Sequence, residues 1–419
     1  MSDAAAKQPD RYVYLDGVRG LASLLVAVCH FVTGFAPALL NGDPAASNYP
    51  GDAQIAHTGW VFFYNPELGV AIFFVLSGYV LAASVAGNAP AWRALALRRW
   101  IRLCLPVLGV ALIIYALQAL GAFKGVPMAA ALSKSAWLSQ MFTPNDYTIT
   151  LVQTVRSALF GIFSTNLSYG LVEDENGVLW TMPVEMWGSL ALFAFYCFGA
   201  DVLNSRKGRM FTIISAVILT FGTPFYGFGI GIALFESLRL FDGLSAPWQA
   251  RLRKGAVPLG GVLLPIGCWL ASTPYAVDAN SSYHAVIMFF YATLGLPFGI
   301  TPMHHAGAGM MIASVLLLRP LQSLLTTWPC RFLGRVSFML YLLQLPVLCF
   351  IGVHVFMHGW LGREYLPRLF TSFAVYIIVA LIVAELATRF IDRPAIRLSR
   401  KVTGWFAPKT NPAIVVRAG

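Results

Sequence analysis

Long apolar stretches separated by short clusters of Lys and Arg dominate the chain. A membrane-spanning helix needs about 20 predominantly apolar residues, and the pattern predicts ten such segments. The predicted spans are 21–40, 60–85, 103–122, 179–205, 211–225, 228–240, 257–271, 306–325, 336–355 and 369–390. Two of them, 211–225 and 228–240, are short for spans and form a hairpin around Gly222, Pro224 and Gly227.

Two other regions are less regular. Segment 283–300 is apolar but is broken by Gly295, Pro297 and Gly299. We expect it to be re-entrant, with a second crossing paired to it as the alternative. Residues 123–178 alternate apolar patches with charged residues, which predicts amphipathic pieces on the outer surface rather than a clean span.

Positive charge indicates which side of the membrane each loop occupies. Lys and Arg concentrate in the cytoplasmic loops of membrane proteins. The loop after the first predicted span contains no Lys or Arg, whereas clusters lie at 93–102, 206–209 and 251–254. Both termini are then cytoplasmic. The predicted organisation is a cytoplasmic tail (1–13), a transmembrane domain (14–395) and a basic cytoplasmic tail (396–419).

Composition fixes the class of protein. Hydrophobic residues make up 58% of the 419 residues and charged residues only 11%, with a mean hydropathy of +0.69. These values predict an all-α, polytopic transmembrane helical bundle in an integral membrane location, either the plasma membrane or an endomembrane. The net charge of +11 does not indicate nucleic acid, because the basic residues lie in short clusters between apolar runs. The six scattered cysteines contain no CxxC spacing and predict neither disulfides nor a metal site.

Arg19 and His30 are the first candidate pair. They are eleven residues apart, so they share one helix face at about 16 Å along the axis. Asp16, three residues before Arg19, lies on the same face and is placed to pair with it. An isolated Arg at a helix end is usually a flanking charge, but a His near mid-membrane is costly and usually faces a cavity or a partner. The pair therefore favours a functional role.

Two further groups of charged residues stand out. Arg98, Arg99 and Arg102 form an RRxxR cluster placed at the start of the third span, where at least two guanidiniums can converge on one anion such as phosphate. The alternative is an anchor that sets orientation. Glu185 lies within the fourth span and needs a partner, a proton or water. The neighbouring Trp180 is read as an interfacial anchor more readily than as a substrate contact.

Other polar residues give weaker signals. Glu385 and Arg389 have the spacing of a helical ion pair. The adjacent His304 and His305 point in different directions, and no metal site is expected there. Walker, HExxH and GxSxG motifs do not occur in the sequence, which disfavours the usual nucleotide-driven, zinc-protease and α/β-hydrolase classes.

Five segments together resemble a known family. YLDGVRGLASLLVAVCH, FFVLSGYVL, LRRWIRL, LWTMPVE and FLGRVSFMLYLLQLP are similar, in this order, to the successive motifs of the acyltransferase-3 family of integral-membrane acyltransferases. The form WTMPVEMWGS is more similar to the fungal branch. The resemblance covers residues from about 14 to 395.

The resemblance implies roles for individual residues. Arg19 and His30 match the Arg and His of the family's first helix, Arg99 and Arg102 its basic motif, and Glu185 its helix-four acid. The candidate catalytic residues are His30, Glu185 and Arg19. The candidate substrate-binding residues, all of which fall inside the family-like motifs, are Asp16, Arg19, Ser77, Arg98, Arg99, Arg102, Trp180 and Tyr341. Gln344 stands where the family usually has His, and no further soluble domain follows the last predicted span.

The implied function is O-acyl transfer. An acyl group, acetyl in the simplest case, would pass from cytoplasmic acyl-CoA to a hydroxyl or amine of a sugar, lipid or small metabolite, with His30 as general base. An acyl-His30 intermediate is the competing mechanism. The alternative function is a proton-coupled permease with Arg19, His30 and Glu185 along its path. It does not explain the RRxxR cluster, and the two halves show no convincing repeat.

Overall fold

The computed structural model describes residues 13–86, 92–142, 150–165, 176–295 and 299–406, and these ranges contain helices and no β-strand. Eight helical segments among them are long and apolar enough to cross a membrane. They are α1 (Val13–Phe35), α4 (Pro66–Val85), α5 (Trp92–Ala119), α8 (Thr181–Phe198) with the turn η7 (Gly177–Trp180) before it, α12 (Ala246–Ala271), α14 (Ile300–Leu317), α16 (Trp328–Val347) continuing into α17 (Val353–His358), and α18 (Tyr365–Ala387) continuing into α19 (Arg393–Phe406). The predicted all-α polytopic bundle is confirmed. The number of ten spans and the cytoplasmic termini stay predictions.

Shorter helices fill the remaining described ranges. They are α2 (Ala38–Asn41), α3 (Asp52–Ile55), α6 (Val126–Ser133), α7 (Leu151–Phe160), α9 (Ala200–Leu203), α10 (Arg206–Thr220), α11 (Tyr226–Asp242), α13 (Ser282–Leu294) and α15 (Arg319–Leu325). Helices α10 and α11 pack together as the predicted hairpin. Helix α13 has 13 residues, about 20 Å at 1.5 Å per residue, and is too short to cross a bilayer alone.

The start of α5 corrects one prediction. The helix begins at Trp92, not at residue 103, so Arg98, Arg99 and Arg102 lie within the helix and not at its start. The sequence-based boundary was late because charged residues resemble a loop in a hydropathy pattern. Arg99 is accommodated in the helix because Glu185, on α8, provides a buried partner.

Close helix crossings bring distant motifs together. A Cβ added to Gly20 of α1 would lie 2.4 Å from the backbone nitrogen of Gly334 on α16. On α4, a Cβ at Gly78 would lie 2.4 Å from the carbonyl oxygen of Phe228 on α11. Small residues let membrane helices approach this closely. The α1–α16 crossing holds the His30 helix against the helix that carries Gln344.

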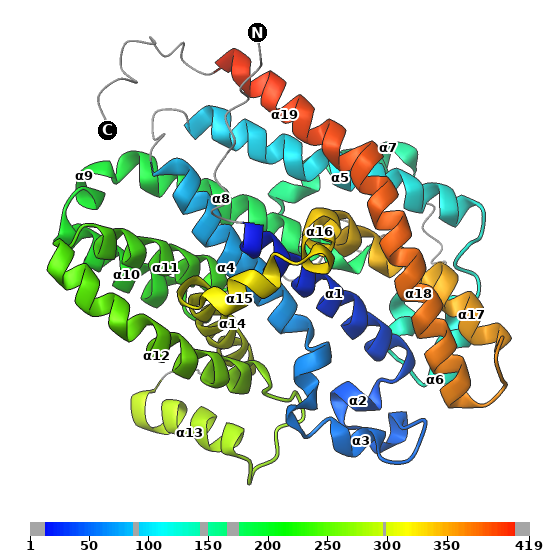
Figure 1. Cartoon of the computed structure of the whole chain (residues 1–419). Coiled ribbons are helices and arrows are strands. Elements are labelled where there is room, and N and C mark those ends of the chain that lie inside the picture. Colours follow the sequence, from blue (N-terminus) through cyan, green and yellow to red (C-terminus); the bar gives the residue numbers. More distant parts are fainter. Residues whose placement is uncertain (1–12, 87–91, 143–149, 166–175, 296–298, 407–419) are drawn as a thin grey trace.

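Different helices lie at the two ends of the molecule (Figure 1). Helix α19 packs along α5 at one end, the upper end in this view, and α2, α3 and α13 lie at the opposite end. The arginine cluster of α5 and the basic α19 therefore share one end of the bundle. Which side of the membrane this end faces stays a prediction from the Lys and Arg clusters.

At the opposite end, the buried Asp52 organises the loop after α2. Its carboxylate accepts hydrogen bonds from the Ser47 hydroxyl at 2.5 Å and from the backbone N–H groups of Asn48 at 2.8 Å, Ala53 at 2.7 Å and Tyr49 at 3.4 Å. Burial alone would raise the pKa of Asp52, but these bonds stabilise the charged form more strongly, and the pKa lies below its usual value.

Candidate active site

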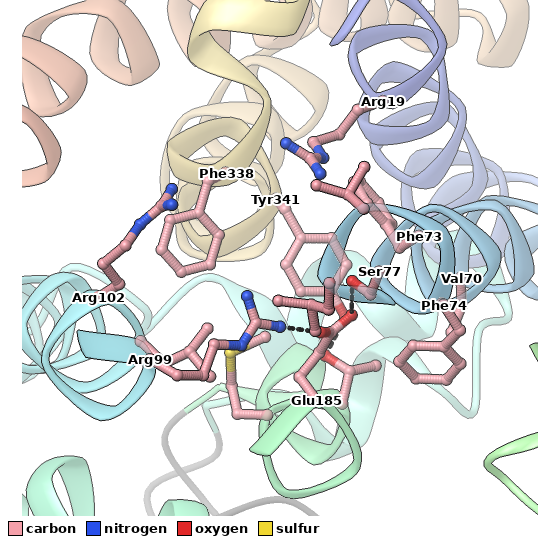
Figure 2. A pocket seen from close by; sticks show the side chains of 15 residues that line it. Arg19, Val70, Phe73, Phe74, Ser77, Arg99, Arg102, Glu185, Phe338 and Tyr341 are labelled. Carbon is pink, nitrogen blue, oxygen red and sulfur yellow. Dashed lines mark hydrogen bonds and ion pairs between the residues drawn. The ribbon is translucent and has the colours of Figure 1, made fainter. Parts of the chain in front are cut away.

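Three arginines and one carboxylate line a cavity between α1, α4, α5, α8 and α16 (Figure 2). We call it the arginine cavity, and its volume is about 200 Å³. Its polar and charged lining residues are Arg19, Ser77, Arg99, Arg102, Thr181, Glu185 and Tyr341. Six residues predicted from sequence, on five different helices, therefore meet in one place.

Glu185 is fixed by partners from two other helices. Its Oε1 accepts a hydrogen bond from the Ser77 hydroxyl at 2.8 Å, and its Oε2 forms an ion pair with Arg99 (Figure 2). The side chains of Arg99 and Glu185 are 17% and 10% exposed. A charge buried to this degree requires a partner, because its desolvation costs several kcal/mol. The partner that the sequence required for Glu185 is thus Arg99.

The other predicted residues differ in whether they line the arginine cavity. Arg19 pairs with Asp16 at 3.5 Å, as the spacing predicted. Asp16 is 58% exposed and does not line the arginine cavity, and neither does Arg98. Tyr341 does line it, and its hydroxyl donates to the carbonyl oxygen of Val178 at 2.9 Å.

His30 lines a second and larger cavity of about 770 Å³, which we call the histidine cavity. Trp180 also lines it. The two cavities share three lining residues, Val70, Phe74 and Tyr341. Arg19 and His30, which lie on the same helix, therefore line two different cavities that adjoin at these three side chains, which we call the shared wall.

The imidazole of His30 has two described contacts that hold its plane. It stacks on Trp137 with ring centroids 5.3 Å apart and an interplanar angle of 4°. Its Nδ1 lies 2.8 Å from the side-chain nitrogen of Gln344, and Gln344 also accepts from the Tyr376 hydroxyl at 3.2 Å. In this arrangement Nδ1 accepts, so a neutral ring carries its proton on Nε2.

The other amide orientation gives His30 the opposite tautomer. With the Gln344 amide turned by 180°, its oxygen accepts from Nδ1–H and Nε2 keeps a lone pair. The Gln344 nitrogen then faces the Tyr376 hydroxyl, which can accept because it lies 3.2 Å from a second acceptor for its own proton, the carbonyl oxygen of Ala27. Only this second arrangement leaves Nε2 able to take a proton.

The structure also reveals a charged group that the sequence did not indicate. Glu67, at the start of α4, lines the histidine cavity. Its Oε2 lies 2.9 Å from Nδ1 of His304, and its Oε1 accepts from the Thr301 hydroxyl at 3.0 Å. Because 237 residues separate Glu67 from His304, no local pattern could have paired them.

The adjacent histidines point in different directions, as predicted. His304 contacts Glu67, whereas Nδ1 of His305 lies 3.0 Å from the carbonyl oxygen of Thr301. The described residues contain no group of three or more His, Cys, Asp or Glu side chains able to hold a metal ion. The predicted helical pair Glu385–Arg389 is also present, at 2.6 Å.

Comparisons with known proteins identify the family of the chain. The acyltransferase domain family Acyl_transf_3 matches residues 12–388. Acyltransferase clz18 of Cochliobolus lunatus is 24% identical over 445 aligned positions, covering 91% of this chain and 93% of clz18. Acyltransferase R4 of a Phoma species is 22% identical over 460 positions, covering 93% and 95%. No solved structure matches this chain.

These matches extend over nearly the whole helical bundle and confirm the resemblance seen in the motifs. The intramembrane charges alone are compatible with both a transferase and a permease. The sequence matches favour the transferase. The chain belongs to the Acyl_transf_3 acyltransferase family and is an integral-membrane enzyme that transfers acyl groups.

Proposed function

We propose that this enzyme transfers an acyl group, acetyl in the simplest case, from cytoplasmic acyl-CoA to a hydroxyl group of a second substrate, an amine being the other acceptor chemistry. One observation carries the proposal. A small cavity lined by three arginines adjoins a large cavity lined by His30, and the two share a wall of three side chains. The acyl end of a donor in the arginine cavity and the hydroxyl group of an acceptor in the histidine cavity can therefore meet where the two cavities adjoin.

The arginine cavity suits the arm of CoA. Its volume of about 200 Å³ is below the range of about 300–1,000 Å³ typical of sites for drug-sized ligands. It accommodates a thin pantetheine chain and excludes the nucleotide. The phosphates then remain at the mouth, where the exposed Arg102 presents the donor fork that suits phosphate oxygens.

The reaction itself requires one proton transfer. The acceptor oxygen attacks the thioester carbonyl carbon, a C–O bond forms, the C–S bond breaks, and the hydroxyl proton moves to Nε2 of His30. The same proton then passes to the leaving CoA thiolate. Positioned general bases contribute about 10²- to 10⁴-fold to such steps.

Arg19 and Glu185 have different roles in the proposed reaction. Arg19 stabilises the negative charge that develops on the carbonyl oxygen, because its ion pair with the exposed Asp16 leaves donors available. Glu185, held by Ser77 and Arg99, orients the Arg99 guanidinium toward the donor. Glu185 acts here through Arg99 and not on the imidazole.

Release of free CoA from acetyl-CoA by detergent-purified protein tests the proposal, with extracts of candidate acceptors supplied. We expect acceptor-dependent release that is lost in His30→Ala, and a raised KM for acetyl-CoA in Arg102→Ala. Arg98→Ala is the matched control, because Arg98 belongs to the same cluster but does not line the cavity. Full activity of His30→Ala would refute the base assignment.

The acyl-His30 mechanism makes a separate prediction. It requires the protein to carry a labelled acyl group after incubation with donor alone, and direct transfer does not. Mass spectrometry of the peptide that contains His30 separates the two mechanisms. The permease alternative fails if acetyl-CoA stabilises the protein and acceptor-dependent CoA release is observed.

A further inference from the structure

The proposed function uses only one residue of the histidine cavity, His30. The volume of the cavity, about 770 Å³, lies within the range of sites that enclose drug-sized molecules. Its walls are mainly apolar and include Val26, Phe74, Val178, Ile287 and Ile300. A ligand bound here gains stability by removing apolar surface from water.

The carboxylate of Glu67 lines this cavity and is held in place by Thr301 and His304. His304 has no exposed surface, whereas the Glu67 side chain is 34% exposed. Each carboxylate oxygen has one described partner, Thr301 on Oε1 and His304 on Oε2, and has capacity for a further hydrogen bond. The carboxylate is thus fixed in orientation and accepts a hydrogen bond from a ligand without moving.

His305 supplies a second unused acceptor. It lines the same cavity and is 6% exposed. Its Nδ1 faces the carbonyl oxygen of Thr301, so Nδ1 carries the proton of a neutral ring and Nε2 has a lone pair. Among the described residues, Nε2 of His305 has no hydrogen-bond partner. A buried polar atom without a partner is uncommon in a folded protein and indicates a missing partner.

We propose that the histidine cavity binds an acceptor that is mostly apolar and carries at least two hydroxyl groups, one presented to His30 and one donating to Glu67. This inference rests on the proposed acyl transfer and names its acceptor class. The walls disfavour a simple sugar, because most of its hydroxyl groups would lose water without gaining a partner. The Glu67 carboxylate and Nε2 of His305 both accept hydrogen bonds, so they favour a ligand that donates them.

Binding of α,ω-alkanediols tests this inference without any acyl donor. Thermal stabilisation of the detergent-purified protein is titrated with diols of six to sixteen carbons, with primary alcohols of the same lengths, and with glucose. We expect one diol length to bind about tenfold more tightly than the matching alcohol, and glucose to give no stabilisation. The comparison at equal chain length reduces the effect of partition into micelles.

Variants assign the diol preference to Glu67. Glu67→Met should reduce the diol-to-alcohol ratio to about one, and Glu67→Gln, which keeps one side-chain oxygen, should reduce it in part. Thr301→Val removes the hydroxyl that holds Oε1 of Glu67 but retains the carboxylate. It should also lower the diol-to-alcohol ratio. Glu364→Met is the matched control, because Glu364 is exposed and lies outside both cavities.

Three results would overturn the inference. The first is an unchanged diol preference in Glu67→Met and Thr301→Val, and the second is stabilisation by glucose equal to that by the diols. The third is a wild-type protein without diol preference. Because no donor is present, these results are independent of the CoA-release assay, whose failure would count against the proposed acyl transfer.

Discussion

Replacing Gln344 with methionine tests how His30 is oriented. Methionine has a similar length but no amide, so Gln344→Met removes the hydrogen bond to Nδ1 of His30 and leaves the stack on Trp137. The Tyr376 hydroxyl keeps an acceptor, the carbonyl oxygen of Ala27. Among the described contacts of Gln344, the substitution therefore leaves the His30 ring nitrogen without a partner, whereas the Tyr376 hydroxyl loses one of its two acceptors.

The expected decrease in kcat follows from the loss of the hydrogen bond to His30. A buried polar group deprived of its partner costs about 1–3 kcal/mol. If the loss falls on the transition state, kcat decreases by roughly 5- to 150-fold, since 1.4 kcal/mol corresponds to a factor of ten. The KM for acetyl-CoA should not change, because Gln344 does not line the arginine cavity.

The assay is acceptor-dependent CoA release at saturating donor, with thermal unfolding measured in parallel. Leu343→Met is the matched control, because it introduces the same side chain at the neighbouring buried position and conserves volume. Gln344→His should recover part of the rate, because imidazole can again pair with Nδ1 of His30. A kcat within twofold of wild type in Gln344→Met would refute the reasoning.

Three further predictions concern stability. Glu185→Ala leaves Arg99 charged and buried without its partner and should cost about 3–5 kcal/mol, seen as a large fall in the melting temperature. Gly78→Ala should destabilise the protein markedly, because the added Cβ would lie 2.4 Å from a backbone oxygen, whereas Gly255→Ala, with no atom within 4 Å, should not; equal melting temperatures would contradict the close crossing. Asp52 has a lowered pKa in the folded protein, so its stabilisation is complete above its unfolded pKa of about 3.9 and is lost as the pH falls through the lower folded value. The difference in melting temperature between wild type and Asp52→Asn should accordingly shrink below about pH 4, and a constant difference down to pH 3 would refute it.

Sequence reasoning recovered features that depend on local spacing. The apolar runs gave the bundle, and intervals of three and four residues gave the Asp16–Arg19 and Glu385–Arg389 pairs. The requirement that a buried charge must have a partner correctly singled out Glu185. These inferences succeed because helix geometry and desolvation act over a few residues.

Features that depend on tertiary contacts were not predictable. Gln344 lies 314 residues from His30, so its contact with the imidazole was visible only in the folded chain. Glu67 resembles an ordinary acidic residue in the first turn of a helix, and nothing in the sequence pairs it with His304. The placement of Arg19 and His30 in two different cavities also depends on α4 and α16, which supply Phe74 and Tyr341 where the cavities adjoin.

That wall of Val70, Phe74 and Tyr341 also affects how well the bilayer remains insulated. A continuous water-filled passage through the two cavities would let protons and small ions cross the bilayer, and would dissipate the gradients that a cell maintains. Three side chains, two of them aromatic, lie where the two cavities adjoin and would narrow such a passage at that point. Truncating one of them would be expected to show up first as a conductance.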